Sequence, residues 1–75
     1  MDNYYLSRID LAEWMPGASG YILQAIDNDT NELIVEISID KHTFWSLPGD
    51  TFEESDLEDD LLEKLLNEYS ELQGD

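Results

Sequence analysis

The sequence predicts a small α+β domain, in which one C-terminal helix covers an antiparallel β-sheet of about three strands. Residues 20–40 hold two β-rich segments joined by a polar turn, which is typical of a β-hairpin. Residues 42–47 can supply a third strand, which a lone hairpin would need for stability. In residues 55–73, leucines recur at helical spacing. The length of 75 residues leaves room for one domain, spanning residues 1–75.

The hairpin is the most clearly marked element. Residues 21–26 are rich in β-formers, and residues 27–31 consist of Asp, Asn and Thr, which favour turns. The following segment alternates between apolar and polar residues, so that one face of the predicted strand carries Leu33, Val35, Ile37 and Ile39. Alternation with one polar side indicates a half-buried antiparallel strand.

The first twenty residues carry weaker signals. We expect an extended segment over residues 4–9 and then a helical turn that begins at Asp10, with Glu13 at the spacing of a capping partner. Met15-Pro16-Gly17 should end that turn.

The last third of the chain predicts the helix. Ser55 and Glu58 have the spacing of a capping box, and Gly74 should stop the helix. Its apolar stripe consists of Leu57, Leu61, Leu62, Leu65, Leu66, Tyr69 and Leu72. The preceding turn at residues 48–50 should close the third strand.

Composition excludes several classes of protein. The chain has no cysteine, which excludes disulfides and thiolate metal sites. It has no apolar run long enough to span a membrane and no signal peptide at its start, so we expect a soluble, cytoplasmic protein. Its net charge of −16 opposes direct binding to nucleic acid or to anionic lipid.

The excess of acidic residues is the main functional signal. Residues 51–75 hold ten of the nineteen Asp and Glu residues, and the whole chain has only three Lys or Arg. A small domain usually keeps its net charge near 2–8 in magnitude. Two explanations fit this excess: a strongly basic partner, which the negative field would attract, or adaptation to a high-salt habitat.

A compact, cysteine-free and very acidic α+β chain resembles the phage-type DNA-mimic inhibitors, which include anti-CRISPR and anti-restriction proteins. It also resembles the acidic immunity proteins that block nucleases. The resemblance rests on size, on charge and on the acidic helix over residues 55–73, and no family motif accompanies it. It implies an inhibitor that binds the nucleic-acid-binding groove of a Cas effector, a restriction enzyme or a nuclease.

We therefore expect electrostatic and steric competition with nucleic acid. The residues expected to meet the partner are Asp56, Asp59, Asp60, Glu63, Glu53, Glu54, Glu32, Glu36 and Asp40. One alternative is an immunity or antitoxin protein that neutralises a nuclease toxin. A halophile-adapted protein and a structural binding module are the others.

Other candidate sites are weaker. Asp27, Asp29 and Asn31 match the start of a calcium-binding loop, but Glu32 stands where that loop needs Gly, so a hairpin turn is the better interpretation. His42 is the only histidine, and we expect no metal, no cofactor and no catalysis. Trp14 and Trp45 are expected in the core, with an exposed partner contact as the alternative for these and for Tyr4 and Tyr5.

Overall fold

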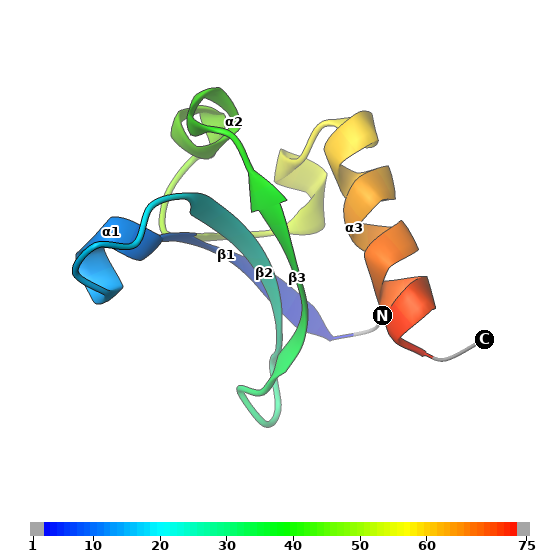
Figure 1. The fold of residues 1–75 in the computed structure, drawn as a ribbon. Helices are drawn as coiled ribbons and strands as arrows, with labels where there is room; N and C mark the ends of the chain where they lie inside the picture. The colour runs from blue at the N-terminus through cyan, green and yellow to red at the C-terminus, as the bar shows by residue number, and fades with distance from the viewer. Residues whose placement is uncertain (1–2, 74–75) are drawn as a thin grey trace.

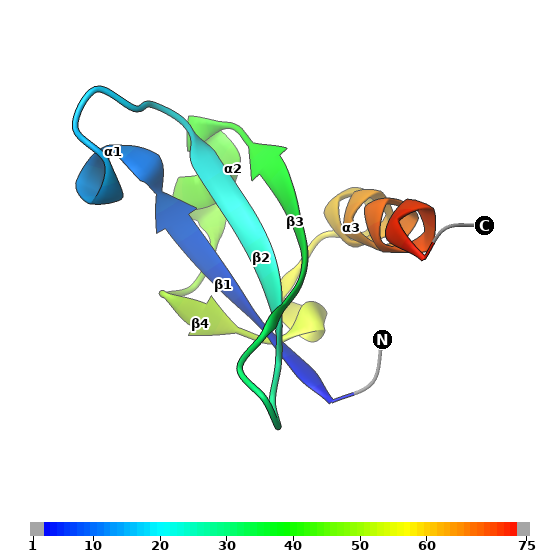
Figure 2. The same cartoon turned by 60° about the horizontal axis from the view of Figure 1, so that its bottom comes forward.

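The computed structural model describes residues 3–73 and confirms the α+β class. Four antiparallel strands form one sheet in the order β3-β2-β1-β4 (Figures 1 and 2). The elements in chain order are β1 (Tyr4–Asp10), α1 (Leu11–Trp14), β2 (Tyr21–Asp27), β3 (Leu33–Ile39), α2 (Lys41–Ser46), β4 (Thr51–Phe52), the 3₁₀ turn η1 (Glu54–Asp56) and α3 (Asp59–Leu72).

The predicted hairpin is confirmed as β2 and β3. Asp27 organises its turn, because its carboxylate accepts hydrogen bonds from the backbone N–H groups of Asp29 (2.7 Å) and Thr30 (3.1 Å). Asn31 takes a left-handed conformation with φ of 59°. The segment is thus a polar hairpin turn.

The predicted alternation along β3 holds for three of its four residues. Val35 and Ile37 are buried and Ile39 packs against the core, but Leu33 is 51% exposed. The register shifts by one residue at this point, because Ala25 pairs with Val35 while Ile26 pairs with Leu33. Such a bulge moves the extra residue, Ile34, towards the core in place of Leu33.

The prediction of a strand at residues 42–47 is wrong, because this segment forms helix α2. The Asp40 carboxylate caps the helix by accepting a hydrogen bond from the Thr43 N–H at 2.7 Å. Phe44 and Leu47 stand three residues apart, so the segment buries both side chains on one side. The turn at residues 48–50 leads into β4, and β1 takes the third place in the sheet.

The expected N-terminal strand and helical turn are confirmed, but no hydrogen bond of Glu13 closes a capping box with Asp10. The extended segment is strand β1, and the carboxylate of Asp10 caps α1 by accepting a hydrogen bond from the Ala12 N–H at 3.1 Å. Helix α1 ends at Trp14, immediately before Met15-Pro16-Gly17.

The C-terminal helix is shorter than predicted. The Asp56 carboxylate accepts a hydrogen bond from the Glu53 N–H (3.1 Å) and holds a separate 3₁₀ turn. Leu57 is then extended and packs against the core, so α3 begins at Asp59, and Ser55 does not start it. The helix ends at Leu72, and the predicted stop at Gly74 lies outside the described residues.

The core lies between the sheet and helices α2 and α3. Leu65 of α3 is fully buried against Leu6 and Leu23 of the sheet. On α2, the Phe44 ring lies with its centre 4.6 Å from that of Tyr21 in β2. Both helices therefore pack on the same face of the sheet, and α3 runs beside β3 (Figure 1). Among residues 3–73, no helix has the length and apolar character needed to cross a membrane.

Candidate partner-binding surface

Helix α3 exposes part of the predicted acidic surface. Because Leu65 points into the core, residues on the opposite side of the helix point outwards, and Asp59, Asp60 and Glu63 are all exposed. Asp59 and Asp60 lie in the first helical turn, where the helix dipole favours negative charge. We refer to Asp59, Asp60 and Glu63 as the α3 acidic face.

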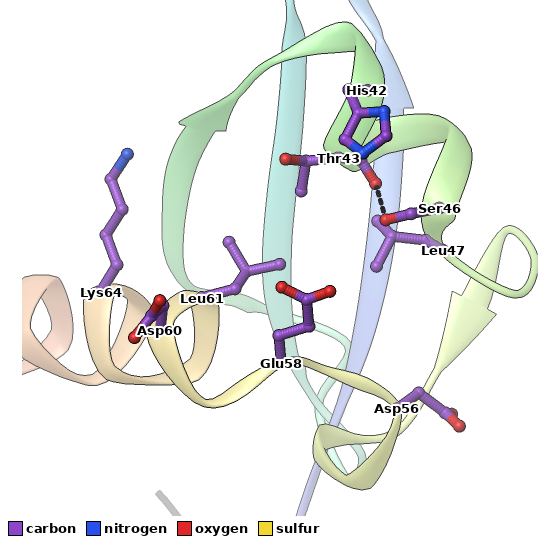
Figure 3. A pocket seen from close by; sticks show the side chains of 9 residues that line it. All are labelled: His42, Thr43, Ser46, Leu47, Asp56, Glu58, Asp60, Leu61 and Lys64. Carbon is purple, nitrogen blue, oxygen red and sulfur yellow. Dashed lines mark hydrogen bonds between the residues drawn. The ribbon is translucent and has the colours of Figure 1, made fainter.

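A pocket of about 360 Å³ adjoins this face and separates α2 from the start of α3 (Figure 3). His42 and Thr43 line it from α2, and Glu58 points into it from the residue preceding α3. Asp60 and Lys64 line it from the helix. The expected partner residue Asp56 belongs to the same lining, although its carboxylate points away from the pocket in Figure 3.

Two further predicted residues, Glu53 and Glu54, lie beyond this pocket, and Glu54 contacts β1. The Tyr4 hydroxyl donates a hydrogen bond to the Glu54 carboxylate. Burial raises the pKa of Tyr4 well above its usual range, and the hydrogen bond to Glu54 and its negative charge add to the rise. Together with Asn28, the pair Glu53 and Glu54 lines a separate depression.

The remaining predicted residues lie in β3 or directly next to its two ends. Glu32 lies in the hairpin turn, which is at the end of the sheet remote from α2 in Figure 1. Glu36 accepts a hydrogen bond from the Gln24 amide at 3.3 Å. Asp40 caps α2. The structure therefore gathers Asp56, Asp59, Asp60 and Glu63 around the start of α3, and it places Glu32 away from them.

Sequence reasoning did not include Glu58 and Lys64 in the site, although both line the pocket. Glu58 stands three residues after Ser55, and this spacing predicts a capping partner for Ser55 and not a binding residue. Within residues 3–73, no three His, Cys, Asp or Glu side chains are arranged to hold a metal ion.

The expected burial of the two tryptophans is wrong. Trp14 is 72% exposed and Trp45 is 62% exposed. Trp14 belongs to the four-residue helix α1, which buries none of its side chains. On α2, Phe44 takes the buried position and the next residue, Trp45, is turned outwards. Tyr4 and Tyr5 are both half-buried, and Tyr4 packs against the core.

Asp40 supports a prediction about pH. Hydrogen bonds from the Thr43 hydroxyl and N–H lower the pKa of Asp40, and the charges of His42 and Lys64 lower it slightly more. The pKa of an Asp carboxyl in the unfolded chain is about 3.9. A carboxyl whose pKa is lower in the folded state stabilises the fold at pH values above its unfolded pKa. That contribution is lost as the pH falls through the folded pKa. Asp40→Ala should therefore lower the melting temperature at neutral pH, and its difference from the wild type should shrink below about pH 4.

Circular dichroism melts of both proteins from neutral pH down to about pH 2 would measure this difference. Asp29→Ala is the control, because Asp29 is an exposed turn residue whose carboxylate accepts none of the hydrogen bonds described above. A difference between Asp40→Ala and wild type that stays constant across this range would contradict the proposed contribution of the charged cap.

Comparisons with protein-family models, with curated proteins and with solved structures found no match to this chain. Its function has to be inferred from the charges, contacts and cavities of the described residues.

Proposed function

We propose that this chain is an acidic inhibitor that binds the basic, nucleic-acid-binding groove of another protein and excludes the nucleic acid. The observation that carries the proposal is the lack of internal neutralisation. Within residues 3–73, the one ion pair joins Arg8 to Asp50 at 3.9 Å, and the Asp50 side chain is almost fully exposed. Among the described residues, most of the other carboxylates are exposed, and none of them forms an ion pair with Lys, Arg or His.

The α3 acidic face supports this proposal. Three exposed carboxylates lie within five residues of one helix, next to a pocket that adds Glu58. Like charges at spacings of three and four residues oppose helix formation by roughly 0.2–0.5 kcal/mol per pair. A cationic partner would remove this repulsion on binding, and the negative field would accelerate the encounter.

The dimensions are also compatible with a mimic of a short duplex. Sixteen phosphate charges occupy ~27 Å of double-stranded DNA, and the longest extent of the protein is 34 Å. Helix α3 alone has 14 residues, or ~21 Å, so the acidic β3 and η1 regions have to contribute to a field of that length. The mechanism is competition by charge and bulk, without catalysis. Cas effectors, restriction enzymes and nucleases are the proposed partners, and the cytoplasm of the host cell is the proposed location.

A displacement experiment tests the proposal. A fluorescent DNA duplex is bound to each member of a panel of restriction enzymes and RNA-guided nucleases, and release of the duplex is followed by anisotropy as the chain is added. We expect release from at least one enzyme, with an affinity that falls by about tenfold or more between ~50 and ~200 mM salt. Binding that leaves the duplex in place, or that is insensitive to salt, would contradict competition.

Matched variants locate the interface. Asp59→Asn with Glu63→Gln removes two charges from the α3 acidic face, and Asp29→Asn with Glu32→Gln removes two from the hairpin turn. We expect the first pair to weaken displacement by about fivefold and the second by less, because direct contacts exceed the effect of a distant charge. Equal losses would show that net charge alone acts and that α3 is not the contact.

A further inference from the structure

A second groove lies between α1, α2, the second half of β1 and the turn that precedes β4. Its volume is about 460 Å³, within the range of ligand pockets. Its lining includes Arg8, Asp10, Glu13, Trp14, Trp45 and Asp50. In Figures 1 and 2, α1 lies beyond the end of β1 whereas α3 lies beside β3, and no residue of α3 lines this groove, so the groove is separate from the α3 acidic face.

Three aromatic side chains line the groove, those of Trp14, Phe44 and Trp45. Trp14 and Trp45 are the most exposed large apolar side chains among the described residues, and both line this one cavity although they come from different helices. Tryptophan is enriched among the residues that carry binding energy at interfaces. Two solvent-exposed indoles in one groove therefore mark a contact surface.

The charge of the groove indicates what it accepts. Three carboxylates, those of Asp10, Glu13 and Asp50, line it together with one cation, Arg8. The Arg8 guanidinium is directed to the carbonyl oxygens of Phe44 (2.7 Å) and Leu47 (3.4 Å), and the side chain is only 15% exposed. The groove as a whole is negative and complements a cation.

The chain itself shows how a guanidinium fits these rings. The central carbon of the Arg8 guanidinium lies 4.5 Å from the centre of the Phe44 ring and 5.6 Å from that of Trp45. These distances are typical of cation–π contacts. Trp45 nevertheless remains 62% exposed, which leaves most of its indole free for a second cation.

We infer that this groove binds an arginine side chain presented by a partner protein. The guanidinium would stack on the exposed indoles and direct its N–H groups to the carboxylates. Arginine fits better than lysine, because its planar group is weakly hydrated, stacks on aromatic faces and can bond a carboxylate through two N–H groups. This inference goes beyond the proposed function, because the groove can bind arginine whether or not the α3 acidic face binds a basic groove.

A fluorescence titration tests the inference, because the only two tryptophans of the chain both line the groove. The probes are the blocked tripeptides Gly-Arg-Gly, Gly-Lys-Gly and Gly-citrulline-Gly, of which the last keeps the shape of arginine without its charge. We expect saturable quenching by the arginine peptide with a dissociation constant of the order of 1–10 mM, as a few exposed contacts allow. The lysine peptide should bind more weakly, and the citrulline peptide should not saturate. Absence of saturation by arginine, or equal binding of citrulline or lysine, would overturn the inference.

Two double variants with the same net charge separate the groove from the general field. Glu13→Gln with Asp50→Asn should weaken the arginine peptide by about fivefold. Asp59→Asn with Glu63→Gln should change its affinity less than about twofold, since neither residue lines the groove and solvent screens exposed charges that make no direct contact. Equal losses would overturn the inference. Glu13→Gln alone, a change at an exposed site, repeats the measurement if the double variant fails to give a folded circular dichroism spectrum.

Discussion

Leu65→Ala should lower the free energy of unfolding by about 2–5 kcal/mol, which is the usual cost of removing a large aliphatic side chain from a filled core. Leu65 has no exposed surface and is the one fully buried residue of α3. A domain of this length has roughly 4–11 kcal/mol of stability in total. The substitution should therefore remove a large part of it, and it should loosen α3 from the sheet.

Urea denaturation followed by circular dichroism measures this loss. Leu66→Ala is the matched control, because it makes the same change at the next residue, which is 39% exposed. We expect the control to cost less than about 1 kcal/mol. Comparable losses for the two variants would mean that α3 does not dock through Leu65.

Arg8→Met should cost about 2–3 kcal/mol, although it exchanges a charged side chain for an apolar one of similar length. Arg8 joins β1 to the C-terminal end of α2 through hydrogen bonds to two carbonyl oxygens, and hydrogen bonds from charged groups contribute about 1.5–3 kcal/mol. The stacking on Phe44 adds to this contribution. The ion pair with Asp50 contributes little, because the Asp50 side chain is almost fully exposed.

The control is Lys41→Met, which changes the net charge equally at an exposed residue of α2. Its effect in urea denaturation should stay within about 0.5 kcal/mol. If Arg8→Met also stayed within this range, the anchoring of α2 by Arg8 would be refuted.

Leu65 and Arg8 show two different limits of prediction from sequence. Leu65 belongs to a leucine stripe that the spacing alone identified, and its burial confirms that stripe at its centre. The same spacing placed Leu72 in the stripe, yet Leu72, the last residue of the helix, is 58% exposed. Arg8 carried no signal in the sequence, since its partners are carbonyl groups of residues far along the chain.

Segment 42–47 illustrates why a local pattern can mislead. Its aromatic and β-branched residues are compatible with a strand, and the preceding strand β3 ends close by. The cap of Asp40 and the common burial of Phe44 and Leu47 favour a helix instead. The third strand of the sheet is β1 instead. The sequence predicted that this segment is extended, but it did not predict that it pairs with β2 and β4.

The acidic site was partly predictable. Sequence spacing placed Asp59, Asp60 and Glu63 opposite the leucines, and all three are exposed on α3. Asp56 was assigned to the same helix but lies in η1, where its carboxylate holds a turn. Glu54 is among the residues expected to meet the partner, and its carboxylate accepts a hydrogen bond from Tyr4, which is remote in sequence.

By itself, the sequence determined the large negative charge, the hairpin and the amphipathic C-terminal helix, because composition and periodicity are properties of single segments. The tertiary structure decided which carboxylates contact remote segments, as Glu54 contacts Tyr4, and which face solvent. It also brought Trp14 and Trp45 into one groove. The two tryptophans belong to segments distant in the chain, and such segments meet where the whole molecule buries the most apolar surface, which no local pattern records.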